Sequence, residues 1–178
     1  MLREIVAELE SPAGAMGSVI SEKKVRQWMA TTDLEAMGAL YALLSEPAQV
    51  ARIRPPIDKL DVSAFLRHYF ERCITENPES QWADSRYSAG WDIAGLLKHW
   101  TKAKDLDSNE LAEWARWLGE LYKKGDDAIQ LSIETATLEH VLDEPAVAEL
   151  FADWLSDPTL AEGYRRSLHG PGSLPERA

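Results

Sequence analysis

The amino-acid sequence predicts an all-α protein, an irregular helical bundle or a short α-solenoid of roughly eight helices. Apolar residues recur at the i, i+3, i+4, i+7 spacing through most of the 178 residues. Polar residues that can cap helix N-termini precede many of these stretches. The best candidate for a strand is 52–57, and Pro55 and Pro56 within it argue against one.

The first 50 residues contain signals for three helices. Residues 2–9 predict a short helix, and the Gly-, Ala- and Pro-rich stretch 11–18 predicts a loop. Ser21 can cap a second helix. Thr32 and Glu35 have the spacing of a capping box, in which two side chains satisfy free backbone N–H groups, and they predict the start of a third.

The middle of the chain predicts two long helices separated by a loop. Asp61 can cap an amphipathic helix whose apolar stripe continues to Ile74. Residues 75–87 are polar and predict a loop, after which Ser88 can start the next helix.

The following region predicts two helices in succession. Asp107 with Glu110 resembles another cap at the start of a helix. Two lysines and Gly125 mark its end, with the glycine expected in the left-handed conformation. Residues 126–142 then read as one largely buried helix.

Two further helices are expected before the C-terminus. Asp143 and Asp157 can cap them, and Pro145 and Pro158 occupy favourable first-turn positions. We therefore expect a single domain, 1–178. It would comprise a short helix and loop (1–20), a main helical core (61–168) and a loose tail (170–178).

Composition and charge exclude several classes of protein. The chain is 45% hydrophobic and 28% charged, as globular proteins are. Its 30 acidic and 19 basic residues argue against nucleic-acid binding. The longest apolar run, 36–44, is too short for a membrane span, and acids interrupt the N-terminus where a signal peptide would be apolar. A soluble cytoplasmic protein that binds neither membrane nor nucleic acid is expected.

The sequence contains no motif for catalysis, a cofactor or a metal, so we expect a non-enzyme. Cys73, the single cysteine, lies on an apolar stripe and is expected to be a core thiol. Asp126 and Asp127 are better explained by a helix N-terminus than by a cation site. No two histidines have the spacing of metal ligands on one helix face. The four are His68, His99, His140 and His169.

Acidic residues are concentrated in one part of the chain. Residues 105–162 contain 15 acidic and 3 basic residues, and 125–162 contain ten acidic residues and no lysine or arginine. Two interpretations stay open, a surface that aids solubility and a docking face for a basic partner. Trp82, in a polar loop, and Trp117, beside an apolar stripe, are candidate apolar anchors. The candidate partner-binding residues are Asp126, Asp127, Glu134, Glu139, Glu144, Glu149, Asp153, Trp117 and Trp82.

Several short motifs carry a resemblance to known proteins. They are Ser85-Arg86-Tyr87, Ala89-Gly90-Trp91-Asp92, Leu138-Glu139-His140, Asp153-Trp154, Asp157-Pro158 and Tyr164. Over residues 65–168 they resemble a group of small bacterial proteins. In size, acidity and lack of catalytic residues the chain also resembles small acidic helical immunity proteins, which neutralise a toxin by binding it. This resemblance implies no catalytic residue. For Arg86, Tyr87 and Asp92 we expect a structural role in fixing the loop.

Three hypotheses follow from these observations. The first is an immunity-type inhibitor that docks its acidic helical face on a basic toxin. The second is a small-molecule-binding protein with a pocket lined by Trp91, Trp100, Trp114 and Tyr122. The third is a helical scaffold subunit, with a homodimer as one form.

Overall fold

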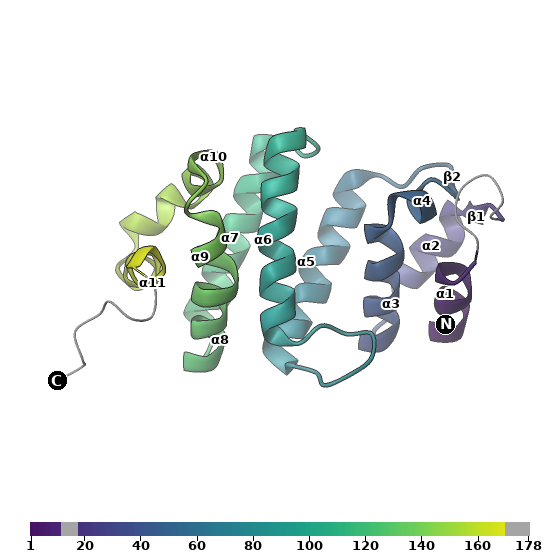
Figure 1. Ribbon diagram of the computed structural model, residues 1–178, viewed down its shortest axis with the longest axis horizontal. Helices are drawn as coiled ribbons and strands as arrows, with labels where there is room; N and C mark the ends of the chain where they lie inside the picture. The colour runs from purple at the N-terminus through teal and green to yellow at the C-terminus, as the bar shows by residue number, and fades with distance from the viewer. Residues whose placement is uncertain (12–17, 170–178) are drawn as a thin grey trace. The chain divides into compact units, whose positions relative to one another are not determined.

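The computed structural model describes residues 1–11 and 18–169 and confirms the all-α class (Figure 1). The expected tail 170–178 and most of the expected loop 11–18 lie outside the described residues. The long helices are α3 (Leu34–Ser45), α5 (Lys59–Glu76), α6 (Arg86–Ala103), α7 (Ser108–Lys124) and α11 (Pro158–His169). The shorter ones are α1 (Leu2–Leu9), α2 (Glu22–Met29), α4 (Pro47–Val50), α8 (Asp127–Ser132), α9 (Glu139–Val141) and α10 (Pro145–Ala148).

The chain divides into two compact units. Unit 1 comprises residues 1–73 and 77–85, and unit 2 comprises residues 74–76 and 86–178. Each unit has its own buried core, and the core of unit 1 includes Trp28, Met37 and Leu40 from the first sixty residues. The expectation of a single domain stays a prediction.

Helix α3 begins one residue later than its capping-box pattern predicts. Asp33, not Thr32, is the cap, and its carboxylate accepts hydrogen bonds from the backbone N–H groups of Glu35 (3.1 Å) and Ala36 (3.4 Å). The Glu35 side chain does not complete a capping box, since it accepts a hydrogen bond from the Trp82 backbone N–H at 3.2 Å. Glu35 of the predicted pair thus has a different use, which is to hold a loop of unit 1.

Helix α5 begins earlier than predicted. Asp58 caps it by accepting from the Leu60 N–H at 2.8 Å. Asp61 lies in the first turn, where its carboxylate pairs with Arg26 of α2 at 2.7 Å. An acid in the first turn also stabilises the helix dipole, so sequence pattern alone does not distinguish the two aspartates.

The prediction that the chain has no strand is wrong for four residues of unit 1. Strand β1 (Ile20–Ser21) pairs in parallel with β2 (Ile53–Arg54), and both isoleucines are buried. The pairing ends immediately before Pro55, which has no N–H to donate. Arg52 is buried beside it and donates to the backbone carbonyls of Glu8 (2.8 Å) and Ser18 (2.9 Å).

The loop between α5 and α6 packs closely on α3. A Cβ atom on Gly38 would lie 2.0 Å from the Trp82 carbonyl oxygen, so only glycine permits this approach. Tyr69 of α5 fixes the other end of the loop, since its hydroxyl donates to the Asp84 carboxylate at 2.8 Å and accepts from the Asp84 backbone N–H at 3.0 Å.

Unit 2 confirms the predicted cap of α7 but not two neighbouring expectations. Asp107 accepts from the Glu110 N–H at 2.9 Å, as expected. Helix α6 begins at Arg86, before Ser88. Gly125 is extended (φ −77°, ψ 155°) and not left-handed. Its lack of a side chain matters for another reason, because a Cβ there would lie 2.4 Å from Ile129.

The prediction that residues 126–142 form one regular helix is wrong. Helix α8 is capped by Asp126 and continues into the π-helix η2 (Ile133–Leu138) and then α9. Helix α6 packs against η2 so closely that a Cβ on Gly90 would lie 2.6 Å from that of Ala136. The Thr137 hydroxyl donates to the Gly90 carbonyl at 3.0 Å.

The last elements of unit 2 are α10, the 3₁₀-helix η3 (Glu149–Ser156) and α11. Asp157 caps α11, as predicted, by accepting from the N–H groups of Thr159 (3.0 Å) and Leu160 (3.3 Å). Asp143 does not cap α10, because Glu144 occupies the N-cap position there.

Candidate functional site

Glu134, one of the predicted surface acids, is buried in unit 2. Only 6% of its surface is exposed. Its carboxylate accepts from the Tyr122 hydroxyl (2.5 Å) and from Arg166 Nε (3.0 Å), and Arg166 Nη2 also donates to the Tyr122 hydroxyl (2.7 Å). Including Glu134 in a docking face was therefore wrong. These hydrogen bonds raise the pKa of Arg166, and burial is the main cause of the raised pKa of Tyr122.

Lysines that precede residues 125–162, which we call the acidic segment, neutralise some of its carboxylates. Lys98 of α6 reaches Glu144 at 3.3 Å and Asp143 at 3.6 Å. Lys123 of α7 reaches Asp157 at 3.6 Å. Counting charge along the sequence could not show this, because the lysines belong to helices that precede the acidic segment in the chain. Glu144 is thus partly compensated.

Four of the predicted acids keep uncompensated charge. Within residues 1–11 and 18–169, Asp127, Glu139, Glu149 and Asp153 have no ion-pair partner. Glu139 is half-buried, and the other three are exposed. Asp126 is exposed too, and its carboxylate caps α8 by accepting from the Ile129 N–H at 2.9 Å. Unit 2 therefore retains an acidic surface, smaller than the sequence count predicts.

The two tryptophans predicted as anchors are half-buried. Trp82 belongs to the loop that packs on α3 in unit 1, away from the acidic segment in the chain. Trp117 belongs to unit 2, and its ring contacts Trp114 edge-on at 5.4 Å between centroids. Their role as anchors stays a prediction.

Two aromatic residues that we assigned to other roles are the exposed ones. Trp91 is 57% exposed and Tyr87, one turn earlier on α6, is 44% exposed. The Trp91 ring meets that of His140 edge-on at 6.4 Å. A signal was present in the sequence, since Ile93 and Leu97, spaced by four, form an apolar stripe that is complete without Trp91.

The residues predicted to line an aromatic pocket lie in three different environments. Trp91 is exposed. Trp100 packs edge-on against Trp114 with centroids 5.2 Å apart. Tyr122 contacts Trp154 at 5.7 Å. These residues pack against other aromatic rings or lie at the surface. A hollow that the structure does contain is lined by other residues.

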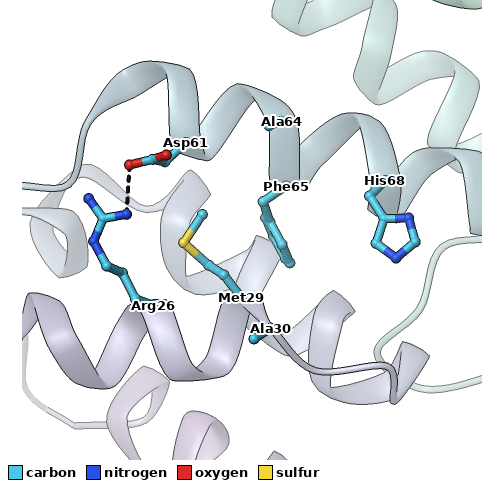
Figure 2. A pocket seen from close by; sticks show the side chains of 7 residues that line it. All are labelled: Arg26, Met29, Ala30, Asp61, Ala64, Phe65 and His68. Carbon is cyan, nitrogen blue, oxygen red and sulfur yellow. Dashed lines mark ion pairs between the residues drawn. The ribbon is translucent and has the colours of Figure 1, made fainter.

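That hollow lies in unit 1, between α2 and α5, and has a volume of about 380 Å³ (Figure 2). Met29 and Phe65 supply much of its apolar lining. Figure 2 shows the Arg26–Asp61 ion pair at one end and His68 at the other. Arg26 also pairs with Glu22, and these two carboxylates raise its pKa.

The single cysteine and the groups that could bind a metal were compared with the requirements of a reactive site. Burial raises the pKa of the Cys73 thiol to about 12, which makes it a poor nucleophile. No three His, Cys, Asp or Glu side chains within residues 1–11 and 18–169 are grouped to hold a metal ion. In the same residues no helix combines the length and apolar character needed to cross a membrane.

Fold and surface together define an all-α protein whose unit 2 carries exposed aromatic and acidic residues. Comparison with protein families, with curated proteins and with solved structures finds no match.

Proposed function

We propose that this protein is a non-enzymatic binding protein that docks the acidic surface of unit 2 on a basic partner protein. An inhibitor that neutralises a basic toxin, as immunity proteins do, is the form of this function that we favour. The observation that carries the proposal is the exposure of Trp91 and Tyr87 in the unit that also holds the uncompensated acids.

The position of the acids supports this proposal. Helix α6, which carries the two exposed aromatics, contacts α9 and α10. Glu139 begins α9, and Glu149 directly follows α10. Carboxylates and exposed aromatic rings on contacting helices suit a partner that presents cationic side chains, since both groups attract a cation.

Energetic considerations also favour a contact surface. Large aromatic side chains supply much of the affinity at protein interfaces when a partner buries them. Charge on the surrounding surface speeds encounter with an oppositely charged protein and excludes partners of like charge. Trp91 with Glu139 and Glu149 combines these two contributions.

The proposal predicts that neutralising three acids of unit 2 weakens partner binding. We choose Glu139→Gln, Glu149→Gln and Asp153→Asn, which keep the size of each side chain. Bait protein is used to capture partners from the native cells, and partners are identified by mass spectrometry. Affinity of a purified partner is then measured by calorimetry at about 50 and 300 mM salt. The triple variant is expected to bind about tenfold more weakly at low salt and to show a shallower salt dependence.

A matched control removes the same charge from unit 1. Glu4, Glu10 and Glu79 are exposed, and their replacement by glutamine changes the net charge equally. This control is expected to bind the partner as the parent does. Equal weakening by both triple variants would mean that only net charge matters, and no weakening by the unit 2 variant would remove the acidic surface from the proposal.

A second candidate function, small-molecule binding, is favoured by the hollow between α2 and α5. Its apolar lining between an ion pair and an imidazole suits a small amphipathic ligand. Ala64 is exposed and lines the hollow, so Ala64→Trp is expected to fill it without loss of stability. A metabolite panel followed by thermal shift tests this function, and a hit should disappear in Ala64→Trp. A hit retained by that variant would place the ligand elsewhere.

A further inference from the structure

A glycine of α6 is not explained by packing within the chain. Gly95 lies in the interior of the helix, where glycine is less favourable than alanine. Gly90 has a reason to be glycine, since Ala136 occupies the space that its Cβ would need. Beyond its two chain neighbours and the backbone of its own helix, a Cβ on Gly95 would meet no described atom within 4 Å.

Gly95 lies on the same face of α6 as the exposed aromatics. Tyr87, Trp91 and Gly95 follow one another at intervals of four residues, which places them on one side of a helix. We call these three residues the α6 strip. The strip offers two aromatic rings and then a stretch of backbone without a side chain, which another chain can approach closely.

The surroundings of the α6 strip are acidic. His140, which contacts Trp91, follows Glu139 directly in α9. Asp143 and Glu144 come one turn later and share a single cation, Lys98. Lys98 itself lies on the same face of α6, seven residues after Trp91, and counted with it Glu139, Asp143 and Glu144 leave a surplus of two negative charges.

We propose that the α6 strip binds an arginine-containing segment of the partner. In this arrangement an arginine guanidinium stacks on Trp91 with Glu139 as its counter-charge, and the backbone of the segment passes over Gly95. Arginine fits better than lysine because its planar, weakly hydrated head stacks on an aromatic ring while its N–H groups still bind a carboxylate. This inference rests on the proposed function and names the feature of the partner that is recognised.

Charge complementarity argues against a second copy of this chain as the occupant. A two-fold interface brings the same patch of both copies together. It would set Glu139 and Glu144 of one copy against the same acids of the other, where like charges repel. A cationic segment meets no such opposition.

The test uses the full chain and two peptides of equal length and charge, one with six arginines and one with six lysines. Indole N–H signals in an NMR spectrum report on the tryptophans, and Trp91→Phe assigns the signal of Trp91. We expect the arginine peptide to shift this signal and to bind at least fivefold more tightly than the lysine peptide. In Trp91→Ala the preference for arginine should disappear.

Two further variants separate contact at the strip from a change in folding. Gly95→Gln places a long side chain over the strip and is a better helix former. It should raise the urea midpoint of unfolding and weaken arginine-peptide binding at least threefold. Leu155→Ala is the control for Trp91→Ala. It truncates a side chain that is about as exposed as that of Trp91 but lies on η3, and it should leave peptide binding unchanged.

The outcomes distinguish this inference from the proposed function. If both peptides bind equally and Glu139→Gln/Glu149→Gln/Asp153→Asn weakens both, the acidic surface stands and the arginine site is overturned. A preference for arginine that persists in Trp91→Ala also overturns it. Failure of both peptides to bind overturns it as well. If sedimentation then shows a dimer that Trp91→Ala dissociates, the α6 strip is a site of self-association.

Discussion

Replacing Arg166 with methionine is expected to lower the free energy of unfolding by about 3 kcal/mol. Methionine keeps the unbranched aliphatic part of the side chain but leaves the Glu134 carboxylate buried without its cation. That carboxylate would retain the Tyr122 hydroxyl, which donates one hydrogen bond at 2.5 Å. One neutral donor does not compensate a buried charge, so most of the cost of desolvation remains.

The measurement is urea unfolding at pH 7, followed by far-UV circular dichroism. Arg165→Met is the matched control, because Arg165 is the neighbouring arginine of α11 and is exposed. It should change stability by less than about 0.5 kcal/mol. A loss of similar size in both variants would mean that α11 is sensitive to any substitution and that the buried pair has no special role.

A double replacement tests whether Glu134 and Arg166 depend on each other for stability. Glu134→Leu combined with Arg166→Met removes both charges, and it should recover much of the stability that Arg166→Met alone loses. Tyr122→Phe should cost about 2 kcal/mol, since it removes the hydrogen bonds of the hydroxyl with Glu134 and Arg166 but leaves the two charges paired. Additive losses in the double variant would contradict the coupling.

The helices were predictable from the sequence because their signals are local. The caps at Asp107, Asp126 and Asp157 depend on a side chain and an N–H group within three residues of it. The errors at α3 and α5 are of the same local kind. In each case an acid near the start of the helix, Glu35 or Asp61, binds a distant group that the local pattern does not reveal.

The burial of Glu134 could not be predicted in the same way. Its cation, Arg166, lies 32 residues further along the chain. The π-helix η2 also changes the helical phase, so the spacing of apolar residues in 126–142 does not report which side of the helix Glu134 takes. A count of acids along the sequence therefore overestimates the charge at the surface.

The exposed tryptophan was partly predictable. From the sequence we assigned Trp91 to an aromatic pocket and chose Trp82 and Trp117 as the candidate anchors, while the structure exposes Trp91. The contact between Gly90 and Ala136 turns the small residues of α6 inward and leaves Trp91 outside. Small residues such as Gly90 beside a large aromatic residue indicate that one of the two faces of the helix is closely packed. Which face is buried depends on Ala136, 46 residues further along the chain.

Raising the pH from about 9 to about 11 is expected to lower the free energy of unfolding of unit 1 by about 4 kcal/mol. The Cys73 thiol and the Tyr69 hydroxyl are fully buried within one helical turn of each other. Burial raises the pKa of Cys73 to about 12 and moves the pKa of Tyr69 far above its ordinary value. In the unfolded chain the cysteine thiol ionises at about pH 9 and the tyrosine hydroxyl at about pH 10.

The sign follows from the number of protons bound. Above about pH 9 the unfolded chain loses the Cys73 proton while the folded chain keeps it, so ionisation favours unfolding. Stability is fully present below that pH. It then falls by about 1.4 kcal/mol per pH unit for Cys73, and Tyr69 adds an equal slope above about pH 10. For Cys73 the fall ends near pH 12, where the folded thiol also ionises.

Urea unfolding at half-unit pH steps measures these slopes, and two variants assign them. Cys73→Ala should remove the slope between about pH 9 and 10, and Tyr69→Phe should reduce it only above about pH 10. Comparing slopes avoids the separate loss of stability that each substitution causes. The same parent slope in Cys73→Ala would show that other groups cause alkaline unfolding. Because the folded thiol stays protonated, a thiol reagent at pH 8 should label Cys73 only as fast as the chain unfolds.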